Sequence, residues 1–221
     1  MATSSPTFFT RMRVEMFLAL KQGNIHSLLR GDRPLDIDVR KDFEFVSKCL
    51  KQMLQALDYL ASENIVHRDI KPANVLYVMD SDNNPDFQLA DFGLAHDFSS
   101  GESVDRWFVG TKGYMAPELE HAEQIGIDQG DVYKMDVWSL FMTVVWIVDA
   151  EQFRNMSRYP LDLGDWVDIG IKAAQSTLRP LRMMAKRLPR ERASAAQMLI
   201  HLYDGDGLST PRDQVAPLDF S

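Results

Sequence analysis

Cysteine is almost absent from this 221-residue sequence, and that scarcity excludes two kinds of crosslink. Cys49 has no second thiol with which to form an intrachain disulfide, and a cysteine-based zinc site needs more than one thiolate. Small secreted domains usually depend on such crosslinks, so the composition favours an intracellular protein of the cytoplasm or nucleus. We expect Cys49 to be buried and unreactive.

Long apolar runs and excess positive charge are also missing. The longest apolar stretch, residues 138–148, is broken by Ser139 and Thr143. It is shorter than the roughly 20 residues that span a bilayer, so we expect a buried helix. No secretory signal pattern is visible. The 32 Asp and Glu residues outnumber 24 Lys and Arg residues, and the net charge of −8 gives no reason to expect nucleic acid or anionic membranes as partners.

The apolar residues that are present suffice for the core of one globular domain, at 45% of the composition. From Lys41 to Ser62 they recur at steps of three and four residues, which predicts a long helix with one buried face. Shorter helices are expected at residues 25–29, 178–185 and 194–202. Short strands are expected at residues 16–20, 65–66, 75–78 and 87–90.

The polar segment between the last two strand candidates contains Asp80, Asp82 and Asn84 at alternate positions, as at the start of a calcium-binding loop. Pro85 stands where such a loop needs glycine, and Asp91 stands where it needs glutamate. A solvated turn is the better interpretation.

Chemistry-bearing residues follow the strand candidate at residues 65–66. Its end runs into His67-Arg68-Asp69-Ile70-Lys71-Pro72-Ala73-Asn74. Asp69 can accept a proton from a hydroxyl nucleophile, Lys71 can neutralise a phosphoryl oxygen, and Asn74 can bind a metal through its side-chain oxygen. Asp91, in Asp91-Phe92-Gly93, follows the last strand candidate and offers a carboxylate for Mg²⁺. These groups indicate phosphoryl transfer.

In order along the chain, these motifs resemble those of the eukaryotic protein kinases, serine/threonine type. The resemblance continues with Ala116-Pro117-Glu118 and with Asp136-Val137-Trp138-Ser139, and Arg192 is placed to pair with Glu118. It implies a mainly α fold with short β-hairpins, corresponding to the large C-terminal lobe of a fold whose complete form is two-lobed and α+β. On this alignment residues 1–15 are a leader, residues 16–203 are the large lobe with a hinge remnant, and residues 204–221 are a tail.

The resemblance also assigns roles. Asp69, Lys71 and Asn74 would be catalytic, and Asn74 and Asp91 would hold Mg²⁺. Asp91 and three leucines would bind ATP, with Leu18 and Leu20 in the hinge and Leu76 beneath adenine. Gly110, Thr111 and Gly113 would support a protein substrate in the activation segment. Structural roles would fall to His67, Arg68, Phe92, Glu118, Asp136 and Arg192, with His67 packed on Phe92 and held by Asp136.

Three parts of a complete kinase domain are not found in these 221 residues: the Gly-rich loop, the phosphate-binding lysine and the glutamate that pairs with it. We therefore expect weak or absent binding of ATP and Mg²⁺ by this lobe alone. The expected partner is a protein substrate or a regulatory protein. Self-association through the face that a small lobe would cover, around Phe17, Leu76 and Phe92, is a further expectation. The alternative function is a catalytically inactive binding or regulatory module.

Overall fold

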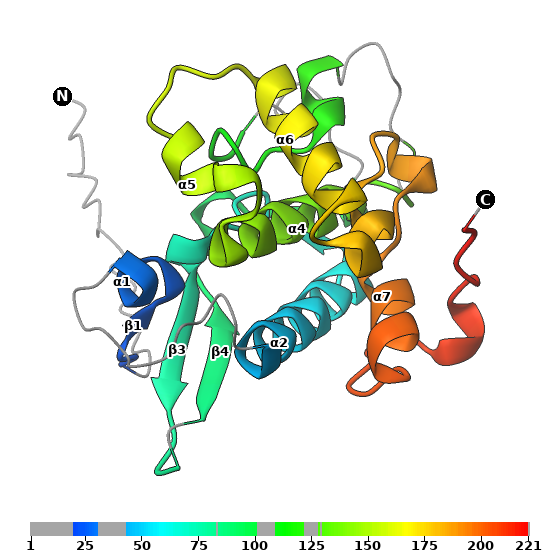
Figure 1. The fold of residues 1–221 in the computed structure, drawn as a ribbon. Helices are drawn as coiled ribbons and strands as arrows, with labels where there is room; N and C mark the ends of the chain where they lie inside the picture. The colour runs from blue at the N-terminus through cyan, green and yellow to red at the C-terminus, as the bar shows by residue number, and fades with distance from the viewer. Residues whose placement is uncertain are drawn as a thin grey trace, which may run out of the picture.

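The computed structural model describes residues 20–30, 43–82, 84–100, 109–121, 128 and 130–220. These residues form a mostly helical fold with two small antiparallel sheets (Figure 1). The α-helices are α1 (Ile25–Arg30), α2 (Phe43–Ser62), α4 (Lys134–Val148), α5 (Phe153–Met156), α6 (Leu163–Gln175) and α7 (Ala195–Tyr203). The strands are β1 (Gly23–Asn24), β2 (Ile65–Val66), β3 (Val75–Met79), β4 (Pro85–Leu89) and β5 (His96–Asp97).

Most of the predicted helices are confirmed. The long helix is α2, whose buried residues lie on one face, and the helices expected at residues 25–29 and 194–202 are α1 and α7. The segment expected to be a helix at residues 178–185 is instead a 3₁₀ helix, η7 (Arg179–Ala185), with Pro180 in its first turn. Pro180 does not account for this difference, because an N–H in the first turn has no partner within an α-helix either. Short 3₁₀ segments are common in connectors of this kind.

Helix α6 was not predicted, although the sequence carries a signal for it. The Asp162 side chain accepts a hydrogen bond from Asp165 N, and the Asp165 side chain accepts one from Asp162 N. This reciprocal pair is a capping box, which fixes the start of a helix. The buried residues of α6 then recur at steps of three and four residues and form the side that faces the core: Trp166, Val167, Gly170, Ala173 and Ala174.

The strand predictions at residues 65–66, 75–78 and 87–90 correspond to β2, β3 and β4. One sheet has the order β1-β3-β4, and the other pairs β2 with β5. Neither β1 nor β5 was predicted. Both have two residues, as β2 does, but β2 is Ile65-Val66, which favours a strand, whereas β1 is Gly23-Asn24 and β5 is His96-Asp97. Residues 16–19 of the remaining strand prediction lie outside the described residues, and Leu20 belongs to no strand.

The Asp80 segment is a tight turn between β3 and β4. Both Asp82 N and Asn84 N donate to Asp80 Oδ1, at 2.9 and 2.8 Å. Asp80, Asp82 and Asn84 are all exposed, as expected for a solvated turn. Within the described residues no cluster of three or more His, Cys, Asp or Glu side chains could hold a metal ion.

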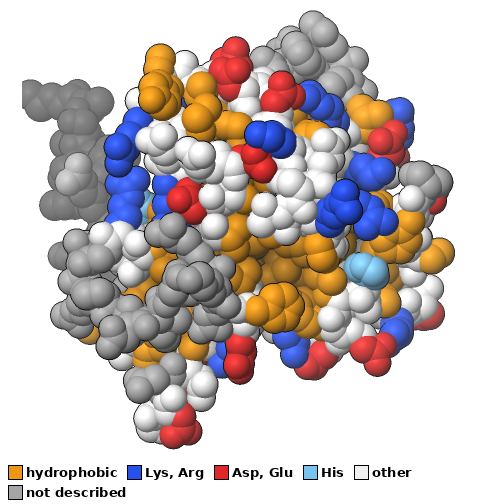
Figure 2. Space-filling view, viewed as in Figure 1, with side chains coloured by type: hydrophobic (Ala, Val, Ile, Leu, Met, Phe, Trp, Pro, Cys, Tyr) orange, Lys and Arg blue, Asp and Glu red, His pale blue; other side chains and the backbone are white. Residues whose placement is uncertain are grey.

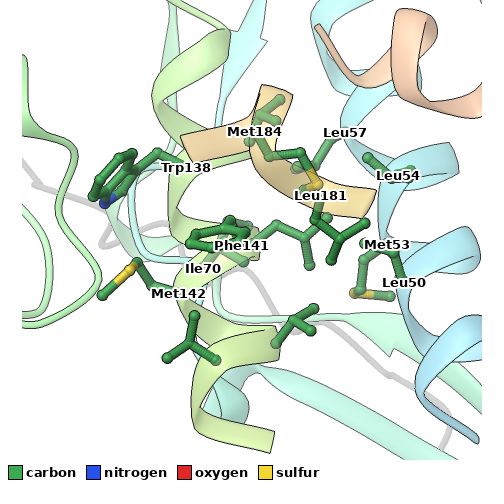
Figure 3. Close-up of a cluster of buried hydrophobic side chains, with 14 of the residues drawn as sticks. Leu50, Met53, Leu54, Leu57, Ile70, Trp138, Phe141, Met142, Leu181 and Met184 are labelled. Carbon is green, nitrogen blue, oxygen red and sulfur yellow. The ribbon is translucent and has the colours of Figure 1, made fainter. Parts of the chain in front are cut away.

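Helix α4 is the centre of the core, as the apolar stretch predicted. Every residue from Met135 to Ile147 is buried, so the helix contacts protein on all sides. In Figure 1 it runs between α2 and α6. Side chains from α2, α4 and η7 meet around it in Figure 3, where Leu50, Met53, Leu54, Leu57, Ile70, Trp138, Phe141, Met142, Leu181 and Met184 are labelled.

Hydrophobic side chains also reach the surface. Figure 2 shows a group of them in the lower centre of one face, with charged side chains above, beside and below this group. Among the described residues, no helix is both long and apolar enough to cross a membrane.

Candidate active site

The loop between β2 and β3 is anchored to the first turn of α4. The buried carboxylate of Asp136 accepts hydrogen bonds from the backbone N–H groups of His67 (2.6 Å) and Arg68 (2.9 Å). Arg68 has φ of 66°, a left-handed conformation that few non-glycine residues adopt. Burial raises the pKa of Asp136 to about 6, although the two N–H donors act in the opposite direction. A strained loop is thus tied to the most deeply buried helix.

His67 is part of this anchor and is fully buried. Its Nδ1 accepts a hydrogen bond from Asp69 N (3.3 Å), so Nε2 is the protonated nitrogen that donates to the Ala90 carbonyl (3.0 Å). Burial lowers the pKa of His67, which favours this neutral form. The ring meets Phe92 edge to face at 4.9 Å between centroids. The expected contacts of His67 with Phe92 and Asp136 are present.

Asp69 is the centre of a hydrogen-bonded cluster. Its Oδ2 accepts from Lys71 Nζ (2.7 Å) and from Asn74 Nδ2 (3.1 Å), and its Oδ1 accepts from Thr111 Oγ1 (2.6 Å). Asn74 Nδ2 also donates to the Asp69 carbonyl at 2.8 Å. The side chain of Asp69 is only 8% exposed. Four residues that the sequence assigned to catalysis or substrate support therefore lie in direct contact.

Lys71 joins the loop to the segment at residues 110–113. Its Nζ donates both to Asp69 and to Thr111 Oγ1, the second at 2.9 Å. A lysine ammonium has three donors, and the third bonds to none of the described residues. The side chain is 24% exposed, so this free donor is available to a ligand.

Gly110 and Gly113 allow Thr111 to come this close. Gly110 has φ of +128°, and a Cβ atom there would lie 2.7 Å from the Arg68 carbonyl oxygen. Gly113 has φ of +90° and lies against Trp166 of α6, where a Cβ would meet the ring at 3.4 Å. The missed helix α6 therefore forms a support for this segment.

Asn74 and Asp91 reach the same end of the β3–β4 hairpin. Ala90 N donates to the Asn74 carbonyl at 2.9 Å, which continues the ladder that pairs Val75 with Leu89. The Asn74 side-chain oxygen accepts no hydrogen bond from the described residues. Asp91 is exposed, and its Oδ1 accepts only a long 3.4 Å bond from Gly93 N. Both oxygens can accept a hard cation.

The leucines that the sequence assigned to adenine binding lie in different environments. Leu76 is half-buried on β3, where it pairs with Asn24 of β1. Leu20 is 96% exposed, and Leu18 and Phe17 lie outside the described residues. Phe92 is 50% exposed, in keeping with the expectation of an accessible face. The structure thus describes only part of the expected nucleotide pocket.

Glu118 and Arg192 form the expected ion pair, with side chains 1% and 0% exposed. Arg192 Nη1 and Nη2 donate to the two carboxylate oxygens at 2.7 and 2.8 Å. The pair connects η5 (Pro117–His121) to the loop before α7. It lies among protein groups with no access for a ligand, which agrees with a structural role.

Comparison with known proteins adds a family match. Residues 16–203 match the sequence profile of the protein kinase domain. The chain is 34% identical to serine/threonine-protein kinase 10 of Danio rerio over 160 residues, which is 69% of this chain and 16% of that protein. It is 33% identical to serine/threonine-protein kinase 10-A of Xenopus laevis over 193 residues, covering 80% of this chain and 19% of that protein.

A third relative, ribosomal protein S6 kinase 2 alpha of Gallus gallus, is 26% identical over 209 residues, or 86% of this chain and 26% of that protein. All of these relatives are much longer proteins, and the matched segment spans between 16% and 26% of their lengths.

Proposed function

The chain belongs to the protein kinase domain family, and from this premise we propose that it is the large C-terminal lobe of a serine/threonine protein kinase. The proposed reaction transfers the γ-phosphoryl group of ATP to a serine or threonine hydroxyl of a protein. The observation that carries the proposal is the Asp69 carboxylate, which Lys71, Thr111 and Asn74 hold in one orientation.

Asp69 is the proposed base. Its two oxygens accept from donors on three sides, and yet the side chain keeps some contact with solvent. In that position it orients the substrate hydroxyl and accepts its proton. The third N–H donor of Lys71, left over from its bonds to Asp69 and Thr111, contacts a γ-phosphoryl oxygen and stabilises the charge there.

Asn74 and Asp91 are the residues that would hold Mg²⁺. Their oxygens fit a hard cation, since neither is consumed by strong hydrogen bonds from the described residues. When bound, Mg²⁺ neutralises negative charge on the phosphates. Leu76 would lie beneath adenine, with Leu18 and Leu20 at the hinge side of the nucleotide.

The segment Gly110–Gly113 supports the substrate backbone in this proposal. Lys71 two residues after Asp69, together with Thr111, is the combination that resembles serine/threonine-directed kinases rather than tyrosine-directed ones. The bond network Lys71–Thr111–Asp69 supports this assignment, because it connects the specificity segment directly to the base.

A second candidate function is a binding or regulatory module without catalysis. One observation favours it: Phe92, beside the candidate site, is 50% exposed and so is available to a partner. A protein regulator or a second copy of the chain would cover this face. No Gly-rich loop occurs in these 221 residues to cover ATP phosphates.

The two functions are separated by measuring transfer of radiolabelled phosphate from ATP to serine- and threonine-containing peptides. The assay uses this chain alone and with a small lobe supplied as a separate polypeptide. Asp69→Asn should lower the rate at least about 100-fold, because a general base contributes roughly 10²–10⁴. Asp82→Asn, the same chemical change at an exposed turn, should leave the rate unchanged.

Calorimetry completes the test. We expect weak binding of Mg·ATP by the chain alone, and Asp91→Asn should weaken binding further in the presence of the small lobe. Equal transfer rates for the wild-type chain and Asp69→Asn would disprove the proposed base. If the chain shows neither phosphoryl transfer nor nucleotide binding, both alone and with the small lobe, the binding module would be favoured.

A further inference from the structure

The C-terminal residues 209–220, which we call the C-terminal strap, are ordered against α2 and α7. In Figure 1 this segment is the red trace beside α7. Gln197 of α7 donates from Nε2 to the Ala216 carbonyl at 2.9 Å, and the Phe220 ring lies 5.2 Å from the His201 ring. Leu218 packs against the core. The sequence analysis had assigned residues 204–221 only to a tail.

Asp58 of α2 is the main polar attachment of the strap. It is 1% exposed and lies on the buried face of the helix. Its Oδ2 accepts from Ser209 N (2.7 Å) and Thr210 N (3.1 Å), and its Oδ1 accepts from Thr210 Oγ1 (2.7 Å). All three hydrogen-bond donors to this buried carboxylate therefore come from two adjacent residues of the strap.

No cation among the described residues pairs with Asp58. A cavity of about 290 Å³ borders Asp58 and Thr210, and Lys134 also lines it. Lys134 is already paired with Asp131 at 2.8 Å. The negative charge of Asp58 is thus compensated by the hydrogen bonds of the strap. Two described cations, Lys134 in the cavity lining and Arg212 two residues after Thr210, are each already paired, with Asp131 and Asp204.

Thr210 is followed by Pro211 on the surface of the molecule. Ser209, Pro211 and Arg212 are exposed, and Thr210 is partly exposed. Pro211 is extended, with φ of −54° and ψ of 131°. Proline-directed serine/threonine kinases accept a threonine that is followed by proline, as Thr210 is followed by the exposed Pro211.

We propose that Thr210 is a phosphorylation site whose modification releases the C-terminal strap from Asp58. A proline-directed kinase acting in trans supplies the reaction. Thr210 Oγ1 forms a bond to the γ-phosphorus of ATP, the bond from that phosphorus to the β–γ bridging oxygen breaks, and ADP leaves. The hydroxyl proton passes to the base of the modifying enzyme.

Two changes at Asp58 then prevent the strap from closing. Phosphothreonine has lost the O–H that donated to Oδ1, and it carries a charge of about −1.5 to −2 beside a carboxylate that is almost fully buried. Like charges at this separation and burial repel strongly. Ser209 N and Thr210 N cannot reach Oδ2 without bringing the phosphate with them.

The order of events follows from the same contacts. Since the hydroxyl of Thr210 is bonded to Asp58 in the closed strap, local opening must precede modification. Variants that weaken the attachment should therefore be phosphorylated faster. Modification should in turn hold the strap open. A phosphate that disfavours the closed strap shifts the same opening equilibrium that first exposed Thr210.

The experiment treats the chain with a purified proline-directed serine/threonine kinase and Mg·ATP. Site-resolved mass spectrometry should find phosphate on Thr210, and Asp58→Ala should raise the initial rate several-fold. Hydrogen exchange of amides within residues 209–218 should become at least about tenfold faster after modification, as expected from losing a hydrogen bond to a charged group.

Matched variants separate the contact from a general charge effect. Thr210→Glu should accelerate exchange of the strap, whereas Ser209→Glu adds the same charge to an adjacent exposed side chain and should change exchange little. The same results in an Asp69→Asn chain would show independence from the proposed catalytic function. The proposal is overturned by lack of phosphate on Thr210 in both the wild type and Asp58→Ala, or by a modified strap that keeps its protection.

Discussion

Two ion pairs in this fold, Glu118–Arg192 and Asp69–Lys71, differ in how many hydrogen-bond donors of the basic side chain already have a partner. All five guanidinium N–H groups of Arg192 donate hydrogen bonds. Two go to the Glu118 carboxylate, and one each goes to the carbonyls of Lys186, Lys134 and Arg187. Lys71 spends two of three donors, on Asp69 and Thr111. The first pair is buried and saturated, whereas the second is partly exposed and keeps one donor free.

This difference indicates which pair holds the fold and which can act on a ligand. A saturated pair has no capacity for a further partner, so Glu118–Arg192 can only connect η5 to the chain before α7. An unsaturated pair at a surface can exchange its protein bonds for bonds to a substrate. We therefore expect changes to the two pairs to separate stability from function.

The largest expected effect is on the buried pair. Arg192→Leu leaves Glu118 as an unpaired buried carboxylate, and breaking such a pair typically costs about 3–5 kcal/mol of unfolding free energy. Urea unfolding followed by circular dichroism would measure the loss. A double variant, Glu118→Leu with Arg192→Leu, removes both charges and should recover part of it. A cost below about 1 kcal/mol for the single change would contradict the structural role.

Glu118 and Arg192 also show what the sequence could reveal. The resemblance to protein kinases, carried by short motifs, pointed to the residues of this pair and of the Asp69 cluster, although Glu118 and Arg192 are 74 positions apart. Periodicity identified α2, because one long buried face leaves a strong repeat, and a long apolar stretch identified α4, which is buried on all sides.

Most of the features that the sequence analysis did not predict depend on contacts between distant segments. β1 and β5 have two residues each, and their pairing with β3 and β2 leaves no periodic signal. Helix α6 carried a capping box that the sequence interpretation overlooked. The attachment of Asp58 to Thr210 joins residues 152 positions apart, which no local pattern encodes.

A backbone change at Gly110 would test how tightly the Lys71–Asp69 pair and Thr111 are positioned. Gly110→Ala puts a Cβ 2.7 Å from the Arg68 carbonyl oxygen at φ of +128°, so the segment bearing Thr111 must move. Such strain costs about 1–3 kcal/mol, measured by denaturant unfolding. Gly130→Ala is the control, because its Cβ would meet nothing within 4 Å. Equal costs for the two variants would show that the approach of Thr111 to Asp69 is not constrained.

The pH dependence of stability probes Asp136, which anchors the functional loop. Burial raises the folded pKa of this group from its ordinary value of 3.8 to about 6. Between these values the folded chain binds a proton that the unfolded chain does not, so this group makes stability rise as pH falls. From pH 7 to pH 5 the expected gain is about 1 kcal/mol.

Asp136→Asn isolates this contribution from those of other groups. His67 acts in the opposite direction, because its lowered pKa makes the folded chain bind fewer protons below the ordinary value of 6.5. The stability of the wild type relative to Asp136→Asn should therefore grow between pH 7 and pH 5. A difference that stays constant or shrinks would show that folding does not raise the pKa of Asp136.

The smallest expected effect on stability is at the Lys71–Asp69 pair itself. Lys71→Met removes one of three side chains that donate to Asp69 and leaves Thr111 and Asn74 in place. Because Lys71 is 24% exposed, its ion pair is partly solvated, and pairs of this kind contribute about 1 kcal/mol or less. Lys51→Met breaks a comparable surface pair with Asp206 and is the matched control. Denaturant unfolding should give similar small losses for both variants, whereas only Lys71→Met should reduce phosphoryl transfer. If Lys71→Met instead cost as much stability as Arg192→Leu, the pair with Asp69 would be structural, and the distinction between the two pairs would be wrong.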